Sequence, residues 1–270
     1  SSMNNRSIAV IDSGVGGLSV WKEIVSLLPH ESIVYLADSA NIPYGTKSAD
    51  TIQQLSSRLV NFLLSQEVKL VVIACNTMTV NALDFLRKMF PMLPIVGTVP
   101  VVKTAATVSQ SKRIGILSTI TTAQSQYQQD LIHAFAPECE VINEGTDELV
   151  SFVERGELQG ESLTQILEKV LTPFKQAGVD TLALGCTHYP FLRDEIKKIV
   201  GKDVHILDSG TAVARQTERI LRNNSILSER HEPTYTFYTT SDAATFERIA
   251  KQIIGHRMSG LIRHAEHITL

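Results

Sequence analysis

The most informative stretch of the chain is Thr181-Leu182-Ala183-Leu184-Gly185-Cys186-Thr187-His188-Tyr189-Pro190. It is an apolar run that ends in a glycine, followed by a cysteine, two polar residues, a tyrosine and a proline. A buried parallel strand has such a composition, and proline is common in the first turn of a helix. The segment 70–79 repeats the design around Cys75. Because ligands bind at the carboxyl ends of strands in open α/β sheets, both cysteines are predicted to face one site.

Strands alternate with helices along the whole chain, which is typical of parallel sheets built from βαβ units. We expect strands at 8–11, 33–37, 70–74, 95–96, 113–117, 140–142, 181–184, 204–207 and 235–239. We expect helices near 18–28, 49–65, 80–90, 101–109, 123–135, 148–155, 161–177, 190–200, 212–222 and 244–253. Pro173 should kink or interrupt the helix that contains it. The tail after residue 255 receives no assignment.

Two internal likenesses predict the domain organisation. The cysteine strands resemble each other, and residues 204–210 repeat the pattern of residues 8–14, an apolar strand followed by Asp-Ser-Gly and a helix. We therefore expect an α/β fold with two similar parallel-sheet domains, related by pseudo-symmetry, and the active site between them. Residues 1–98 plus 209–270 form the first domain in this prediction, and residues 99–208 form the second. Ser1 and Ser2, which precede Met3, are interpreted as a cloning remnant.

The composition narrows the class of protein. The chain has 270 residues, 43% of them hydrophobic, and a net charge of −3 with no run of basic residues. Nucleic acid and an anionic membrane are therefore not expected as partners. The sequence contains no apolar run of membrane-spanning length and no signal peptide. Three cysteines are too few for a disulfide framework, which favours a reducing cytoplasm.

Cys75 and Cys186 each stand just before an expected helix, where the pKa of a thiol falls below its usual value of about 8.5. Cys139 is interpreted as a small buried hydrophobe. Asp12 and His188 are the groups best placed to orient the two reactive thiols. Other residues offer hydroxyl, amide or backbone N–H donors for a carboxylate substrate, although helix capping would also explain several of them. These are Ser13, Tyr44, Gly45, Asn76, Thr77 and Thr187.

The roles of two further acids and two alternative interpretations of the site remain open at this point. Asp38 and Glu154 are possible secondary residues of the site or ordinary solvated acids. The segment 14–17 (Gly-Val-Gly-Gly) resembles a dinucleotide fingerprint, but Ser19 stands where the third glycine belongs. A zinc site of Cys75, Cys186 and His188 lacks the usual ligand spacing. We expect neither a cofactor nor a metal.

Four motifs in order along the chain resemble the glutamate racemase family. They are Asp12-Ser13-Gly14-Val15-Gly16-Gly17-Leu18-Ser19, Pro43-Tyr44-Gly45, Ala74-Cys75-Asn76-Thr77 and Gly185-Cys186-Thr187-His188-Tyr189-Pro190. The resemblance covers essentially the whole chain. It implies a cofactor-independent enzyme that interconverts L- and D-glutamate, the latter for bacterial peptidoglycan, and acts as a homodimer.

The resemblance also implies roles for single residues. Cys75 and Cys186 would be the acid and base, with Asp12 assisting Cys75 and His188 assisting Cys186. The family's pattern assigns the proton of D-glutamate to Cys75 and that of L-glutamate to Cys186. The residues implied to hold the substrate are Asp12, Ser13, Tyr44, Gly45, Asn76, Thr77, Thr187 and His188.

Three alternative functions are weighed against this one. An aspartate racemase of the same superfamily is the nearest. A hydrolase with a cysteine nucleophile would use one thiol together with His188, and it would leave the other cysteine without a role. An amino-acid-binding regulator would use the same loops without turnover.

Overall fold

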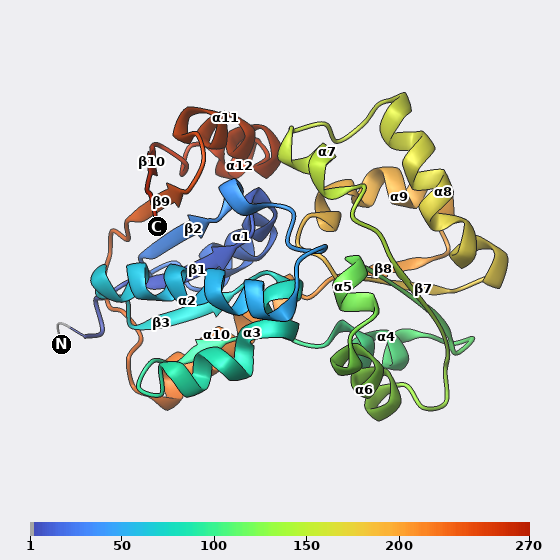
Figure 1. Ribbon diagram of the computed structural model, residues 1–270, viewed down its shortest axis with the longest axis horizontal. Helices are drawn as coiled ribbons and strands as arrows, with labels where there is room; N and C mark the ends of the chain where they lie inside the picture. Colours follow the sequence, from blue (N-terminus) through green and yellow to red (C-terminus); the bar gives the residue numbers. More distant parts are fainter. Residues whose placement is uncertain (1–2) are drawn as a thin grey trace.

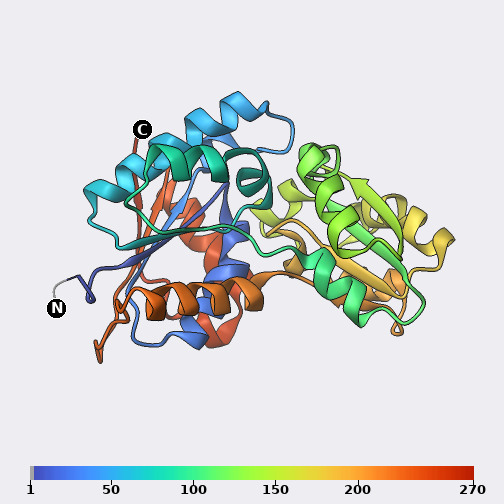
Figure 2. The ribbon, with the colours of Figure 1, turned by 90° about the horizontal axis from the view of Figure 1, so that it is seen from below.

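The computed structural model describes residues 3–270, so Ser1 and Ser2 lie outside the described part of the chain. Two lobes lie side by side, and each is built around one parallel sheet (Figures 1 and 2). Within residues 3–270, every helix is too short or too polar to cross a membrane.

The first lobe contains the six-stranded sheet, with the strand order β10-β9-β2-β1-β3-β4 and every pairing parallel. In chain order its strands are β1 (Ile8–Asp12), β2 (Ile33–Ala37), β3 (Leu70–Ile73), β4 (Ile95–Val96), β9 (Tyr235–Thr239) and β10 (Ala265–His267). The chain leaves this sheet after β4 and returns to it for β9.

The second lobe contains a four-stranded parallel sheet with the order β6-β5-β7-β8. Its strands are β5 (Arg113–Ser118), β6 (Glu140–Gly145), β7 (Thr181–Leu184) and β8 (His205–Leu207). This order matches β2-β1-β3-β4 of the first lobe, so β3 and β7 occupy equivalent positions. The expected α/β fold with two parallel-sheet domains is therefore confirmed. The domain boundaries at 98/99 and 208/209 remain our proposal, and they fall where the chain passes between the sheets.

The interpretation of the Asp-Ser-Gly repeat as a structural repeat is wrong. Strand β1 lies in the middle of its sheet, whereas β8 is an edge strand that pairs with β7. The shared sequence has a local cause instead. Asp12 accepts a hydrogen bond from the backbone N–H of Gly14, and Asp208 accepts one from that of Gly210, so both aspartates close the same short turn.

Helices cover both faces of each sheet (Figure 2). The first lobe contains η1 (Val15–Gly17), α1 (Leu18–Leu27), η2 (Ser39–Asn41), α2 (Ala49–Ser65), α3 (Asn76–Met89), α10 (Gly210–Asn223), α11 (Ala243–Ile254) and α12 (His256–Ser259). The second contains α4 (Val101–Val108), α5 (Ile120–Ala123), α6 (Gln126–Phe135), α7 (Val150–Glu154), α8 (Glu161–Ala177), η3 (Tyr189–Leu192) and α9 (Arg193–Val200).

The sequence of β1 shows why its sheet is covered on both sides. Its side chains are fully buried, and alternate residues point to opposite faces. Ile8 and Val10 pack into the cluster that contains Trp21 of α1, while Ala9 and Ile11 pack into the cluster under α2 and α3. An apolar strand of this kind is stable only between two helical layers.

The helix that follows Cys75 begins earlier than predicted. We expected it near residue 80, but α3 begins at Asn76, because the Cys75 sulfur caps it by accepting the Met78 backbone N–H at 3.4 Å. The predicted interruption at Pro173 is also wrong, since α8 runs through it to Ala177. Buried Leu171 and Phe174 anchor the helix on both sides of the proline.

Three other boundaries differ from the prediction. The expected helix at 123–135 is two helices, α5 and α6, because the Ser125 hydroxyl caps the second one by accepting the Gln128 N–H at 3.0 Å. The expected helix at 190–200 begins with the 3₁₀ turn η3. The unassigned tail forms α12 and the edge strand β10.

Candidate active site

The two cysteines come together in one cavity. Cys75 follows β3 and Cys186 follows β7, so the pseudo-symmetry of the lobes brings equivalent strand ends to face each other. The cavity has a volume of about 10 Å³. It is lined by Ser13, Pro43, Tyr44, Gly45, Cys75, Asn76, Thr77, Thr119, Val150, Cys186, Thr187 and His188.

Nine of the residues singled out from the sequence line this cavity, and the three acids stand behind them. Asp12, Asp38 and Glu154 each hydrogen-bond to groups that line the cavity or lie next to them. They therefore hold the lining residues in place without lining the cavity themselves.

Asp12 lies behind the Cys75 half of the cavity. Its side chain is fully buried, and it accepts hydrogen bonds from the Gly14 N–H and the Thr187 hydroxyl, both at 3.0 Å. Burial raises the pKa of Asp12, while His188 opposes this rise. Thr187 belongs to the second lobe, so the Asp12 carboxylate connects the two lobes.

The Cys75 thiol does not have the lowered pKa that its place at a helix N-terminus predicted. Burial raises the pKa of Cys75, and the nearby Asp12 raises it further, whereas hydrogen bonds from the Met78 N–H and the Ser13 hydroxyl lower it. Burial outweighs the helix terminus because the sulfur lies in an enclosed site. Cys75 therefore holds its proton.

The Cys186 half contains a chain of three side chains. His188 Nδ1 lies 3.7 Å from the Cys186 sulfur, and His188 Nε2 lies 2.6 Å from Glu154 Oε2. Glu154 Oε2 also accepts the Val15 N–H at 2.7 Å. Burial lowers the pKa of His188, but the contacts with Cys186 and Glu154 outweigh it and raise the pKa well above its usual value. The arrangement favours a protonated imidazole between the Cys186 sulfur and the Glu154 carboxyl group.

The glycines of segment 14–17 make room for this chain. A Cβ on Gly14 would overlap the Glu154 carboxylate, and a Cβ on Gly16 would overlap the His188 ring. In the dinucleotide interpretation, these glycines would let the backbone approach a pyrophosphate. In the structure they allow two side chains of the second lobe to approach the first.

Tyr44 is held by Asp38. The Tyr44 hydroxyl donates to Asp38 Oδ2 at 2.5 Å, and Asp38 Oδ1 accepts from Asn41 Nδ2 at 2.9 Å and from the Thr240 hydroxyl at 2.8 Å. Asp38 is buried, so the solvated-acid reading is wrong for it. It fixes the loop that carries Tyr44 and Gly45.

Sequence reasoning missed the threonines at the end of β5. The Thr77 hydroxyl lies 2.6 Å from the Thr119 hydroxyl and 3.2 Å from that of Thr122, across the two lobes. A signal was present, since Thr119 directly follows a strand that ends at the same edge as Cys186. The pattern alone did not show that this edge faces Thr77.

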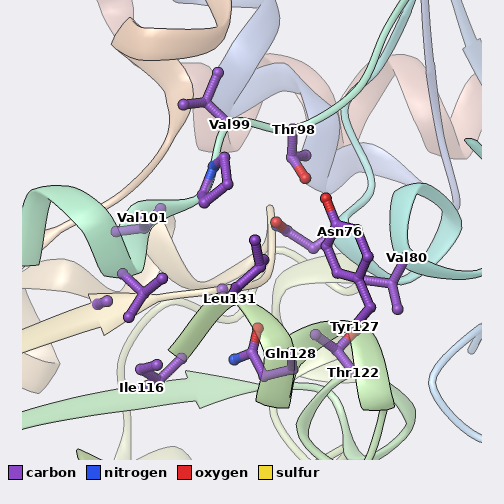
Figure 3. A pocket seen from close by; sticks show the side chains of 14 residues that line it. Asn76, Val80, Thr98, Val99, Val101, Ile116, Thr122, Tyr127, Gln128 and Leu131 are labelled. Atoms are coloured by element: carbon purple, nitrogen blue, oxygen red, sulfur yellow. The ribbon is translucent and has the colours of Figure 1, made fainter. Parts of the chain in front are cut away.

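A second cavity lies beside the first, where the chain crosses between lobes (Figure 3). Its volume is about 40 Å³, and Asn76 lines both this cavity and the cavity that contains the two cysteines. Apolar side chains such as Val80 and Leu131 line it together with polar ones such as Thr98 and Gln128. The side chains of residues 3–270 include no group of three or more His, Cys, Asp or Glu arranged to hold a metal ion.

The whole chain resembles known racemases. Residues 8–217 match the Asp/Glu/hydantoin racemase family. The chain is 40% identical to the glutamate racemase of Pseudomonas aeruginosa over 247 residues, which cover 92% of this chain and 93% of that one. It is 43% identical to that of Pseudomonas entomophila, with coverage of 92% and 94%.

Solved structures agree with the sequence matches. The crystal structure of a glutamate racemase from Bacillus anthracis has a TM-score of 0.87 at 33% identity and covers 99% of this chain and 98% of that one. The glutamate racemase of Francisella tularensis in complex with D-glutamate has a TM-score of 0.85 at 32% identity, covering 98% of each chain.

The chain therefore belongs to the Asp/Glu/hydantoin racemase family. Its relatives over nearly the full length are glutamate racemases, so the resemblance found in the sequence is confirmed. The protein is an isomerase that acts on an amino acid.

Proposed function

We propose that this chain interconverts L- and D-glutamate without a cofactor, by two-base proton transfer between Cys75 and Cys186. The observation that carries the proposal is the meeting of the two thiols, from equivalent strand ends, in one cavity. Racemisation requires a base on one face of the substrate Cα and an acid on the other. Two fixed groups prevent the proton from returning to the face that it left.

The surroundings of the two sulfurs support unequal starting states. His188, whose pKa is raised, lies 3.7 Å from the Cys186 sulfur, where a protonated imidazole can donate to it. Burial and Asp12 raise the pKa of Cys75, which favours a thiol. We propose that in the free enzyme Cys186 starts as the base and Cys75 as the acid.

The proposed step breaks one C–H bond and forms another. The Cys186 thiolate takes the Cα proton as S–H, and the Cys75 thiol gives its own proton to the opposite face of Cα. The negative charge that develops on the substrate carboxylate meets hydroxyl, amide and backbone donors, which cost little reorganisation because they are already aimed. Ser13, Asn76 and Thr187 are proposed as such donors, with the Tyr44–Gly45 backbone and Thr77 at the remaining carboxylate.

Optical rotation with L-glutamate and L-aspartate as substrates tests the proposal. We expect the rotation of L-glutamate to decay to zero, because the relatives that match over the full length are glutamate racemases. L-Aspartate should decay far more slowly. Faster loss with L-aspartate would favour the aspartate racemase. Binding without any loss of rotation would favour the regulator, and a covalent acyl-enzyme mass would favour the hydrolase.

The biological setting follows from the same proposal. A D-glutamate product would serve peptidoglycan synthesis, in the cytoplasm where that precursor chemistry takes place. The free state of Cys75, Cys139 and Cys186 is compatible with a reducing compartment. We also propose a homodimer, on the strength of the family resemblance.

Substrate binding requires the lobes to separate. A cavity of about 10 Å³ has room for about one water and none for an amino acid. At its mouth, the backbone N–H of Thr121 donates to the Gly45 carbonyl at 3.1 Å, and the Thr121 hydroxyl donates to the same oxygen. These bonds between lobes must break for glutamate to bind and form again around it.

Gly45→Ala should block this closure. The new Cβ would overlap the Asp147 carboxylate of the other lobe and press on Thr119. We expect kcat/KM for glutamate to fall roughly 10²-fold, the loss associated with a displacement of about 1 Å in a catalytic site, with little change in melting temperature. Steady-state kinetics and thermal unfolding measure the two effects.

The matched control is the double variant Gly45→Ala/Asp147→Ala, which removes the group that the new methyl meets. It should recover part of the lost kcat/KM. Full activity in the single variant would mean that the contact between Gly45 and Asp147 does not form during turnover.

A further inference from the structure

Tyr35 is a fully buried residue of β2 to which the proposed mechanism assigns no part. Its hydroxyl donates to the Gly14 carbonyl at 2.7 Å, so it reaches the loop that follows β1. A Cβ on Gly17 would lie 2.7 Å from the hydroxyl oxygen, which shows how closely this loop covers the phenol. The hydroxyl therefore contacts the backbone of the loop rather than the cavity that contains the two cysteines.

One peptide group lies between Tyr35 and the second lobe. The Gly14 carbonyl and the Val15 N–H belong to the same planar unit, and in a trans peptide they point in opposite directions. Tyr35 donates to the carbonyl, and Glu154 Oε2 accepts the N–H at 2.7 Å. Two side chains from different lobes therefore hold one peptide group from both sides.

The contact with Glu154 continues to the second cysteine. The oxygen that accepts the Val15 N–H, Glu154 Oε2, also lies 2.6 Å from His188 Nε2. His188 Nδ1 in turn lies 3.7 Å from the Cys186 sulfur. The Val15 N–H and the His188 ring thus hold the same carboxylate oxygen, so a change at the 14–15 peptide reaches the ring that faces Cys186.

The hydrogen-bonding capacity of a phenol decides what Tyr35 contributes. Burial raises the pKa of Tyr35 well above its usual value, as do the Asp12 and Glu154 carboxylates, so the hydroxyl keeps its proton and donates. A hydrogen bond to a peptide carbonyl polarises the peptide and strengthens the bond that its N–H donates. A phenylalanine ring would fill the same space, but it would leave the Gly14 carbonyl without this donor. The hydroxyl therefore strengthens the bond from Val15 to Glu154.

We infer that Tyr35 is a positioning residue for the Cys186 half of the site. It acts through the 14–15 peptide, which holds the Glu154 carboxylate and, through it, the His188 ring. The inference rests on the proposed two-base function and deepens it. The Cys75 sulfur is held by a separate bond, from the Met78 N–H at 3.4 Å. Loss of the hydroxyl should therefore impair one of the two proton transfers and spare the other.

The test is Tyr35→Phe, which keeps the ring and removes the hydroxyl, in proteins that retain one of the two site cysteines. In Cys75→Ser, exchange of the Cα hydrogen of L-glutamate in D₂O reports the Cys186 half. In Cys186→Ser, exchange with D-glutamate reports the Cys75 half. We expect Tyr35→Phe to slow the first exchange about tenfold, the size of one buried hydrogen bond, and to leave the second unchanged. Equal losses, no loss, or a larger loss of the second exchange would overturn the inference.

A double-mutant cycle tests the route through Glu154. In the Cys75→Ser protein, Glu154→Ala removes the carboxylate that the Val15 N–H meets. Tyr35→Phe should then add little to the loss that Glu154→Ala causes, because the two changes act on one chain of contacts. A further tenfold loss would show that the hydroxyl acts by another route, and the inference would be wrong.

The matched control is Tyr238→Phe on β9, the strand that pairs with β2. It removes a hydroxyl that donates to Gln66 at 3.2 Å, away from the loop after β1. Both exchange rates should stay unchanged in this variant. A selective loss of the L-glutamate exchange here would contradict the assignment to Tyr35, since any hydroxyl of the sheet would then have the same effect.

If Tyr35→Phe does not fold, Val15→Pro replaces it. Proline lacks the N–H that meets Glu154, and Val15 opens η1, a position that proline tolerates. This variant should show the same selective loss, and its absence would again contradict the inference.

Failure of the proposed function is distinguishable from failure of the inference. It would appear as a wild-type protein that does not racemise glutamate. Hydrogen exchange of the Val15 amide, followed by NMR, requires no turnover, and it should be about tenfold faster in Tyr35→Phe. The Gly210 amide, which donates to Asp208 at 2.9 Å in the second Asp-Ser-Gly turn, should keep its rate. An unchanged rate at Val15 would overturn the inference whatever the enzyme does.

Discussion

We expect racemisation of glutamate to fall by roughly 10²–10⁴-fold when either Cys75 or Cys186 is replaced by serine, the range typical for loss of one acid–base group. The two variants should keep opposite halves of the proton transfer. Cys75→Ser retains the base that faces L-glutamate in the family's pattern, so it should still exchange the Cα hydrogen of that enantiomer in D₂O. Cys186→Ser should exchange the Cα hydrogen of D-glutamate. Polarimetry measures the first effect and proton NMR measures the second.

The surroundings of the two sulfurs also predict which variant exchanges the Cα hydrogen faster. Burial and Asp12 keep the proton on Cys75, whereas the raised pKa of His188 places an imidazolium beside Cys186 that can donate to its sulfur. Exchange by Cys75→Ser should therefore be faster at neutral pH than exchange by Cys186→Ser.

The matched control is Cys139→Ser, at a half-buried thiol away from the cavity, which should behave as the wild type. Equal exchange of both enantiomers by one cysteine variant would contradict the proposal, because a single base would then reach both faces of the substrate.

The sequence predicts the positions of the two thiols because the reasoning is local. An apolar strand that ends in Gly-Cys or Ala-Cys before a helix places the sulfur at the carboxyl edge of a parallel sheet wherever it occurs. The equivalent strand orders then bring the two edges together. The same reasoning explains why nine predicted residues line one cavity.

Contacts between the lobes could not be predicted in this way. Thr187 donates to Asp12 across 175 positions of sequence, and Val15 donates to Glu154 across 139. No periodicity encodes which strand ends face each other at such separations. The roles of Glu154 and of the glycines that make room for it therefore appear only in the folded chain.

The protonation of Cys75 could not be predicted for a related reason. The rule that a helix N-terminus lowers the pKa of a thiol considers only neighbours in sequence. The opposing contribution, which is larger, comes from the burial of the sulfur and from the Asp12 carboxylate. Strand β10 was missed because Ala265, Glu266 and His267 carry no strand-like pattern, and backbone pairing with β9 alone defines it.

Lys69→Met should lower the free energy of unfolding by about 3–5 kcal/mol, because it leaves the carboxylate of Glu31 buried without its partner. The two side chains are 0% and 1% exposed, and Lys69 Nζ lies 2.7 Å from Glu31 Oε1. The Lys69 ammonium also donates to the carbonyls of Asn4 at 2.5 Å and Ile226 at 2.6 Å, and Glu31 Oε2 accepts the Ser228 N–H at 2.6 Å. The pair thus joins three separate segments of the first lobe. Urea denaturation at constant m measures the loss.

The same variant should keep the wild-type kcat. Glu31 and Lys69 precede β2 and β3, at the opposite end of the sheet from Cys75, so they hold the returning chain rather than the substrate. Glu31→Leu/Lys69→Met should recover much of the stability, because it replaces the Glu31 carboxylate, which the single variant leaves buried and unpaired, by an apolar side chain. Lys198→Met, at an exposed pair with Glu195, should leave the denaturation midpoint unchanged. A fall in kcat as large as that of a cysteine variant would show that the two ends of the sheet are coupled.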